Sequence, residues 1–110
     1  MHKLDDNWYS EAHDAANSAI SFKIKRLLHS EKTPFQTIDI YETTDWGNLM
    51  VIDACVMLTT RDNFLYHEMM SHPALYTHPR AKRVVIIGGG DCGTLREVLK
   101  HRSEEHTSEL

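Results

Sequence analysis

The stretch that decides the fold runs from Val84 to Gly93 and reads Val-Val-Ile-Ile-Gly-Gly-Gly-Asp-Cys-Gly. Val84 to Ile87 is apolar at every position, which predicts a central parallel strand covered on both faces. Gly88, Gly90 and Gly93 follow at the spacing G-x-G-x-x-G, and a helical pattern begins at once over residues 94–101. A buried strand, a glycine turn and a helix in this order predict the first unit of a Rossmann-like α/β domain.

The glycine turn predicts a binding site for an adenosine-type ligand. Glycines allow a tight turn and close approach of the backbone to a ligand, and the helix N-terminus offers unpaired N–H groups. The turn does not separate dinucleotide enzymes from adenosyl-donor enzymes, because the acid that grips the ribose lies about 20 residues further on. The plain alternative is a strand-to-helix turn that binds no ligand.

The residues before the turn predict a smaller, β-rich domain. Alternating apolar residues favour a strand within 19–28, although Ile24, Leu27 and Leu28 also fit helical spacing, and residues 1–18 carry only a weak pattern. Ile38 and Ile40 alternate with polar residues, and a turn-rich cluster over 43–48 separates them from a second apolar run over 49–58. Two such runs with a Gly/Asn/Asp turn between them predict a β-hairpin.

Residues 61–71 suit one helix, and Pro73 and Pro79 are expected to bound an irregular stretch after it. The predicted organisation is therefore a small N-terminal β-sheet domain over 1–78, which includes this helix, and the start of a Rossmann-like domain over 79–101.

Composition excludes several classes of function. The chain has twelve Lys and Arg residues and sixteen Asp and Glu residues, for a net charge of -4. It therefore lacks the excess of basic residues that is typical of nucleic-acid-binding proteins. Cys55 and Cys92 form no C-x-x-C pair, and His67, His72 and His78 are too irregularly spaced for a helical zinc pair, so no metal is expected. No apolar run is long enough to span a membrane and no signal sequence is visible, which favours a cytoplasmic protein.

Five ordered segments resemble the spermidine synthases, the polyamine aminopropyltransferases. The resemblance covers about residues 7–101, and the Tyr-His-Glu-Met-Met sequence at 66–70 is similar to bacterial members. The segments are Trp8–Glu11, Leu28–Gln36, Gly47–Asp53, Thr60–Met70, and Val85–Asp91 with Leu95–His101.

The resemblance implies a group-transfer reaction. The family moves an aminopropyl group from decarboxylated S-adenosylmethionine to putrescine and releases spermidine and methylthioadenosine, without a metal or another cofactor. It also implies a small β domain before a Rossmann-like domain, and a homodimer or homotetramer. No nucleic acid or membrane partner is expected.

The resemblance assigns roles to individual residues. Donor or methylthioadenosine binding is implied for Gln36, Gly88, Gly90, Asp91 and Gly93. Polyamine binding is implied for Tyr66, His67, Asp91 and, as an aromatic wall, Trp8. A carboxylate at Asp91 suits the donor, whose aminopropyl end is cationic. The aspartate that acts as general base in the family is expected beyond residue 110, so no catalytic residue is assigned.

Each assigned residue also has a plain structural alternative. Gln36 on a strand is an ordinary surface residue, Tyr66 packs in a core with its hydroxyl bonded, and His67 has no special role. Asp91 caps the helix that follows. Two departures from the family pattern are Cys92 and Ala54, which stand where glycine or another small residue is common and which disfavour a positive φ.

Residues 102–110 are expected to be a non-native tail, because they are polar and aperiodic and resemble the translation of a sequencing-library adapter. The strand at 84–87 would then lack parallel neighbours, and the 110-residue chain alone is expected to be inactive and poorly folded. Two other classes stay open: an S-adenosylmethionine-dependent methyltransferase or NAD-binding Rossmann enzyme, and a non-catalytic β-rich oligomerisation module.

Overall fold

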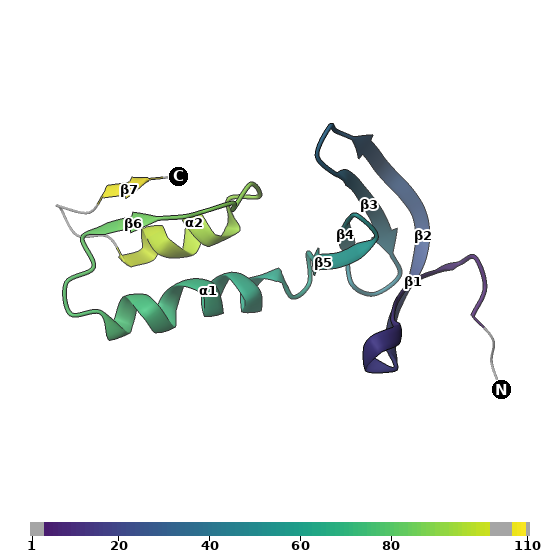
Figure 1. Cartoon of the computed structure of the whole chain (residues 1–110), viewed down its shortest axis with the longest axis horizontal. Helices are drawn as coiled ribbons and strands as arrows, with labels where there is room; N and C mark the ends of the chain where they lie inside the picture. The colour runs from purple at the N-terminus through teal and green to yellow at the C-terminus, as the bar shows by residue number, and fades with distance from the viewer. Residues whose placement is uncertain (1–3, 102–106, 110) are drawn as a thin grey trace. The chain divides into compact units, whose positions relative to one another are not determined.

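The computed structural model describes residues 4–101 and 107–109 (Figure 1). It divides into two compact units, Met1–Asp62 and Asn63–Leu110. In this division, the helix that was expected near residues 61–71 groups with the glycine turn and not with the β-rich part.

The first unit is an antiparallel sheet whose strands follow one another in sequence order. Its strands are β1 (Trp8–His13), β2 (Ser18–Lys32), β3 (Thr37–Thr43), β4 (Asn48–Ile52) and β5 (Cys55–Thr59), with the 3₁₀ turn η1 (Asp14–Ala16) between the first two. The predicted strand over 19–28 is confirmed within β2. The predicted hairpin is confirmed as the β3–β4 pair, in which Ile40 lies opposite Met50.

Two predictions for this unit are wrong. The apolar run over 49–58 is not one strand, because Asp53 and Ala54 take positive φ values of 50° and 66° and turn the chain between β4 and β5. A two-residue hairpin turn of this kind needs positive φ at both positions. Strand β1 was also missed, since its polar residues hide the alternation that identifies a half-buried strand.

The sheet curls so that its first and last strands meet. The Val56 N–H on β5 donates to the Glu11 carboxylate on β1 at 2.6 Å, and the Tyr9 hydroxyl donates to the Ala54 carbonyl at 2.5 Å. The enclosed core consists of Phe22, Leu49 and Val51, with Tyr9, Tyr41 and Val56 packed against it. Burial of these side chains is the main favourable term that this small unit has for folding.

The second unit contains the predicted strand, glycine turn and helix. Its elements are α1 (Asn63–Thr77), β6 (Arg83–Val85), α2 (Gly93–Val98), the 3₁₀ turn η2 (Leu99–His101) and β7 (Thr107–Glu109). Helix α1 runs through Pro73, where an irregular stretch was expected. A proline inside a helix removes one ladder hydrogen bond and crowds the carbonyl four residues earlier. The helix continues nevertheless, and the Ser71 and Thr77 hydroxyls donate to the carbonyls of His67 and Pro73.

Two expectations about the strand after α1 are also wrong. Val85 and Ile87 are 67% and 97% exposed, so the strand segment is not covered on both faces within the described residues. The strand was also expected to lack a parallel neighbour, yet β6 pairs parallel with β7. Strand pairing uses main-chain groups, which polar residues supply as well as apolar ones.

In the described ranges, no helix has the length and apolar character needed to cross a membrane.

Candidate functional site

The glycine turn has a backbone that only some residues tolerate. Gly88 and Gly89 have φ values of +87° and +69°, in the region that side chains disfavour. Cys92 has a φ of 62°. This residue therefore adopts the positive φ that its side chain disfavours, as the sequence indicated. The Cys92 N–H donates to the Gly89 carbonyl at 2.9 Å, which closes the turn before α2 begins.

Asp91 lies between the turn and helix α2 and uses both of its carboxylate oxygens. Oδ1 accepts the Gly93 N–H at 3.1 Å, which is an Asx turn at the start of the helix, whereas the N-cap position itself is Cys92. Oδ2 lies 3.2 Å from Nε2 of His67. The side chain is still 33% exposed, which leaves part of the carboxylate open to a cationic ligand.

His67 connects helix α1 to the glycine turn. The residue is only 2% exposed, and its Nδ1 lies 3.2 Å from the Thr94 hydroxyl on α2. A Cβ added to Gly93 would lie 2.1 Å from Nε2 of His67. The third glycine of the motif is therefore required by the imidazole ring packed against it.

Tyr66 stands beside His67 at the start of α1. Its ring centroid lies 5.2 Å from the imidazole centroid in an edge-on arrangement. The side chain is 54% exposed, so the alternative in which Tyr66 fills a core is wrong. The second unit thus brings Tyr66, His67 and Asp91 together at the turn that contains Gly88, Gly90 and Gly93.

Gln36 and Trp8 belong to the first unit. Gln36 is exposed in the turn between β2 and β3, so it is not on a strand as one alternative assumed. Thr33 fixes this turn: its Oγ1 accepts the Gln36 N–H at 3.0 Å, and its N–H donates to the Gln36 carbonyl at 2.8 Å. Trp8 is half-buried at the start of β1, opposite Lys23 on β2.

Sequence reasoning missed two features of helix α2. Thr94 was not singled out, although it contacts His67. Glu97 was given no role in the site, yet it is 1% exposed and its Oε2 lies 2.6 Å from Nζ of Lys100. The hydrogen bond from Lys100 lowers the pKa of Glu97 despite its burial. The i, i+3 spacing of this acid and base was the available signal.

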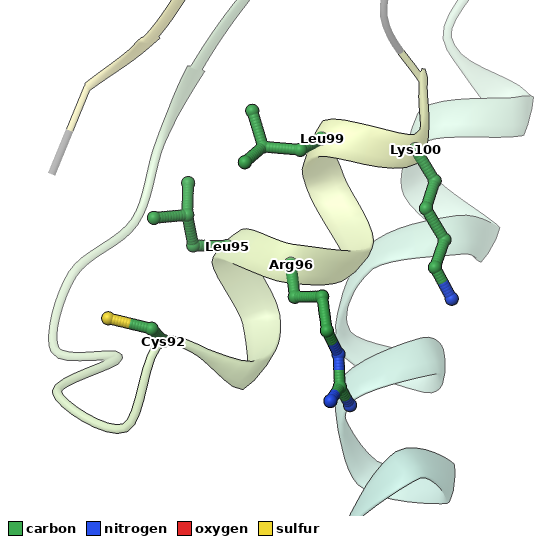
Figure 2. Close-up of a pocket in the computed structure, with 5 residues that line it drawn as sticks. All are labelled: Cys92, Leu95, Arg96, Leu99 and Lys100. Atoms are coloured by element: carbon green, nitrogen blue, oxygen red, sulfur yellow. The ribbon is translucent and has the colours of Figure 1, made fainter.

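An open hollow of about 520 Å³ lies along α2 (Figure 2). It is lined by Cys92, Leu95, Arg96, Leu99 and Lys100. Its lining does not include His67 or Asp91. The hollow is therefore distinct from the polar cluster that Tyr66, His67 and Asp91 form. We place the candidate site at the cluster, because that is where buried and half-exposed ionisable groups converge.

Comparison with known proteins agrees with this architecture. Residues 7–60 match the family model described as the spermidine synthase tetramerisation domain, and residues 63–108 match the spermine/spermidine synthase domain. The polyamine aminopropyltransferases of Xanthomonas euvesicatoria and Alkalilimnicola ehrlichii are each 64% identical to the chain, over 105 and 99 residues. These alignments cover 96% and 90% of this chain but only 37% and 35% of the relatives.

Two solved structures resemble this chain. Spermidine synthase from Thermotoga maritima matches with a TM-score of 0.79 and 46% identity, over 86% of this chain and 32% of that one. A spermidine synthase in complex with the transition state analogue AdoDATO matches with a TM-score of 0.84 and 40% identity, over 97% of this chain and 36% of that one.

Fold and site together define an α/β protein with a small curled β domain before the first strand, glycine turn and helix of a Rossmann-like domain. The matches narrow this class: the chain belongs to the spermidine synthase family, the polyamine aminopropyltransferases. It spans about a third of the length of the curated relatives that it matches.

Proposed function

We propose that this chain supplies the donor-binding part of a spermidine synthase. The observation that carries the proposal is the contact between buried His67 and half-exposed Asp91, built on the glycine turn. A carboxylate that is oriented by two neighbours and still partly open is suited to hold an ammonium group.

The reaction transfers an aminopropyl group from decarboxylated S-adenosylmethionine to putrescine. The unprotonated putrescine nitrogen attacks the propyl carbon next to the sulfonium, a C–N bond forms and the C–S bond breaks. The sulfur keeps the electron pair and leaves as methylthioadenosine, and the new secondary amine gives up one proton. The donor is already activated by its sulfonium, so the residues present here bind and orient.

Asp91 pairs with the ammonium at the aminopropyl end of the donor, and Gly88, Gly90 and Gly93 let the backbone approach the nucleoside. Gln36, held by Thr33 in its turn, contributes to nucleoside binding. Asp91 also contributes to binding the cationic polyamine.

Tyr66 and His67 in the second unit, and Trp8 in the first, are each proposed to contact the polyamine, as the family resemblance implies. Tyr66 presents an exposed ring beside His67, and Trp8 supplies an aromatic wall. Aromatic faces attract cationic amines, which matches a substrate that carries an ammonium at each end. The whole enzyme is proposed to act in the cytoplasm as a homodimer or homotetramer, without a metal.

A full-length chimera tests this function. Residues 1–101 of this chain replace the matching residues of the Xanthomonas euvesicatoria polyamine aminopropyltransferase, to which the chain is 64% identical. With putrescine and decarboxylated S-adenosylmethionine, the chimera is expected to release spermidine and methylthioadenosine in equal amounts, measured by chromatography. The proposal is wrong if the chimera unfolds cooperatively, as a folded protein does, yet forms no spermidine while the parent relative does.

A further inference from the structure

We propose that Thr94 is a positioning residue that acts on the donor site through His67. Its hydroxyl holds the buried imidazole in the orientation that presents Nε2–H to Asp91. The inference rests on the proposed function, in which Asp91 binds the cationic end of the donor.

The two nitrogens of His67 face two different oxygens. Nε2 lies 3.2 Å from Oδ2 of Asp91, and Nδ1 lies 3.2 Å from Oγ1 of Thr94. An ionised carboxylate only accepts hydrogen bonds, so Nε2 must carry a proton to bond it. In the neutral ring Nδ1 is then an acceptor, and the Thr94 hydroxyl is its donor.

No other described contact is placed to take over this role. His67 is 2% exposed, so water has little access to Nδ1. Tyr66 meets the ring through an edge-on aromatic contact, which does not select a tautomer. Gly93 limits movement of the ring, since even a Cβ there would lie 2.1 Å from Nε2. The carboxylate of Asp91 selects the tautomer with the proton on Nε2, and the Thr94 hydroxyl bonds the other nitrogen and so fixes the orientation of the ring.

Loss of the Thr94 hydroxyl therefore affects Asp91. Without the hydroxyl, buried Nδ1 loses its hydrogen bond, and one of the two polar contacts that hold the ring is gone. The ring can then tilt within its packing and weaken the contact between Nε2 and Oδ2, so Asp91 is held less firmly in the orientation that its contacts with His67 and Gly93 maintain. The donor loses an oriented partner, although neither Thr94 nor Nδ1 touches it.

The matched pair Thr94→Val and Thr94→Ser tests the inference in the chimera. Valine keeps the shape of threonine without the hydroxyl, and serine keeps the hydroxyl. Thr94→Val is expected to raise the donor KM about tenfold and to change kcat less than about twofold, because one buried hydrogen bond is lost. Thr94→Ser should return the donor KM to within about threefold of the parent value. Equal defects in both variants, or none in Thr94→Val, would overturn the proposal.

A double-mutant cycle with His67→Phe shows whether Thr94 acts through the imidazole. Phenylalanine retains a ring against Gly93 but has no nitrogens, so adding Thr94→Val should no longer change the donor KM. The same fold-change in both backgrounds would mean that Thr94 acts independently and would overturn the proposal.

Urea unfolding of the same four proteins gives a second cycle that needs no substrate. Non-additive changes in unfolding free energy are expected if the Thr94–His67 contact exists, and additive changes would refute it. If the unmutated chimera forms no spermidine, this result counts against the proposed function. The unfolding cycle can still be interpreted, because it does not depend on activity.

Discussion

Asp91→Asn is expected to lower kcat/KM for the decarboxylated donor by roughly 10- to 100-fold in the chimera, the range for losing a hydrogen bond to a charged group. Asparagine keeps the side-chain shape and an acceptor oxygen for the Gly93 N–H, so the turn retains its hydrogen bond. What it loses is the negative charge that is proposed to pair with the ammonium, together with the second acceptor oxygen, which faces Nε2 of His67. Steady-state kinetics with the donor varied at saturating putrescine provide the measurement.

Asp14→Asn is the matched control for this substitution. Asp14 is exposed in η1 of the first unit and is not among the site residues, so the variant removes one negative charge without altering the site. Its kcat/KM is expected to stay within about twofold of the parent value. If Asp91→Asn behaves like Asp14→Asn, Asp91 does not hold the donor.

Gly93→Ala is expected to destabilise the chimera by about 1–3 kcal/mol, the usual cost of overpacking. The new Cβ would lie 2.1 Å from the His67 ring, so α1 and the turn must separate or the ring must move. The donor KM should rise as well, because a displaced ring no longer orients Asp91. Urea unfolding monitored by circular dichroism gives the stability change.

Two other glycines of the turn supply the comparison. A Cβ at Gly90 would meet nothing within 4 Å and its φ is not positive, so Gly90→Ala should change stability by less than about 0.5 kcal/mol. Gly88 has open space but φ +87°, and Gly88→Ala should cost about 1–2 kcal/mol through backbone strain alone. A Gly93→Ala variant as stable as Gly90→Ala would show that the glycine is not required by His67.

The features that the sequence predicts well are those set by local chemistry. The strand, glycine turn and helix at 84–101 follow from an apolar run and from three glycines at fixed spacing. The β3–β4 hairpin likewise follows from alternation on both sides of a turn-rich cluster. Both signals lie within a few residues of the structure that they specify.

The features that the sequence pattern does not predict depend on residues elsewhere in the chain. Strand β1 is polar in pattern, yet it is held by pairing with β2 and by the contact of Glu11 with Val56, 45 positions further on. The division of residues 49–58 depends on positive φ at Asp53 and Ala54, which side-chain type discourages. Helix α1 continues past Pro73 although an internal proline removes one helix hydrogen bond and crowds the preceding turn, and the packing of α1 on α2 is the long-range contact that offsets this cost.

In the candidate site, too, the sequence identifies residues but not the contacts between them. The resemblance singled out His67 and Asp91 from separate motifs, but the motifs alone do not say that the two side chains touch. The 3.2 Å contact and the burial of His67 come from packing α1 on α2. Thr94 carries no signal of its own, because an isolated threonine after a glycine turn is typical of a helix start.

The start of α1 also explains where the second unit begins. The family match for the spermine/spermidine synthase domain starts at residue 63, and the second compact unit starts at Asn63. His67 on α1 packs against Gly93, so the glycine turn and this helix form one structural element. We therefore expect any fragment designed to bind the donor to require α1 as well as the Rossmann-like strand.

Calorimetric titration of the chimera with three ligands tests the central claim most directly. Decarboxylated S-adenosylmethionine presents only an ammonium to Asp91, whereas intact S-adenosylmethionine adds a carboxylate that the aspartate repels. The decarboxylated donor is expected to bind at least about tenfold more tightly than intact S-adenosylmethionine, with no saturable binding of NAD. Equal or tighter binding of intact S-adenosylmethionine or NAD would contradict the account and assign the glycine turn to a methyltransferase or a dinucleotide enzyme.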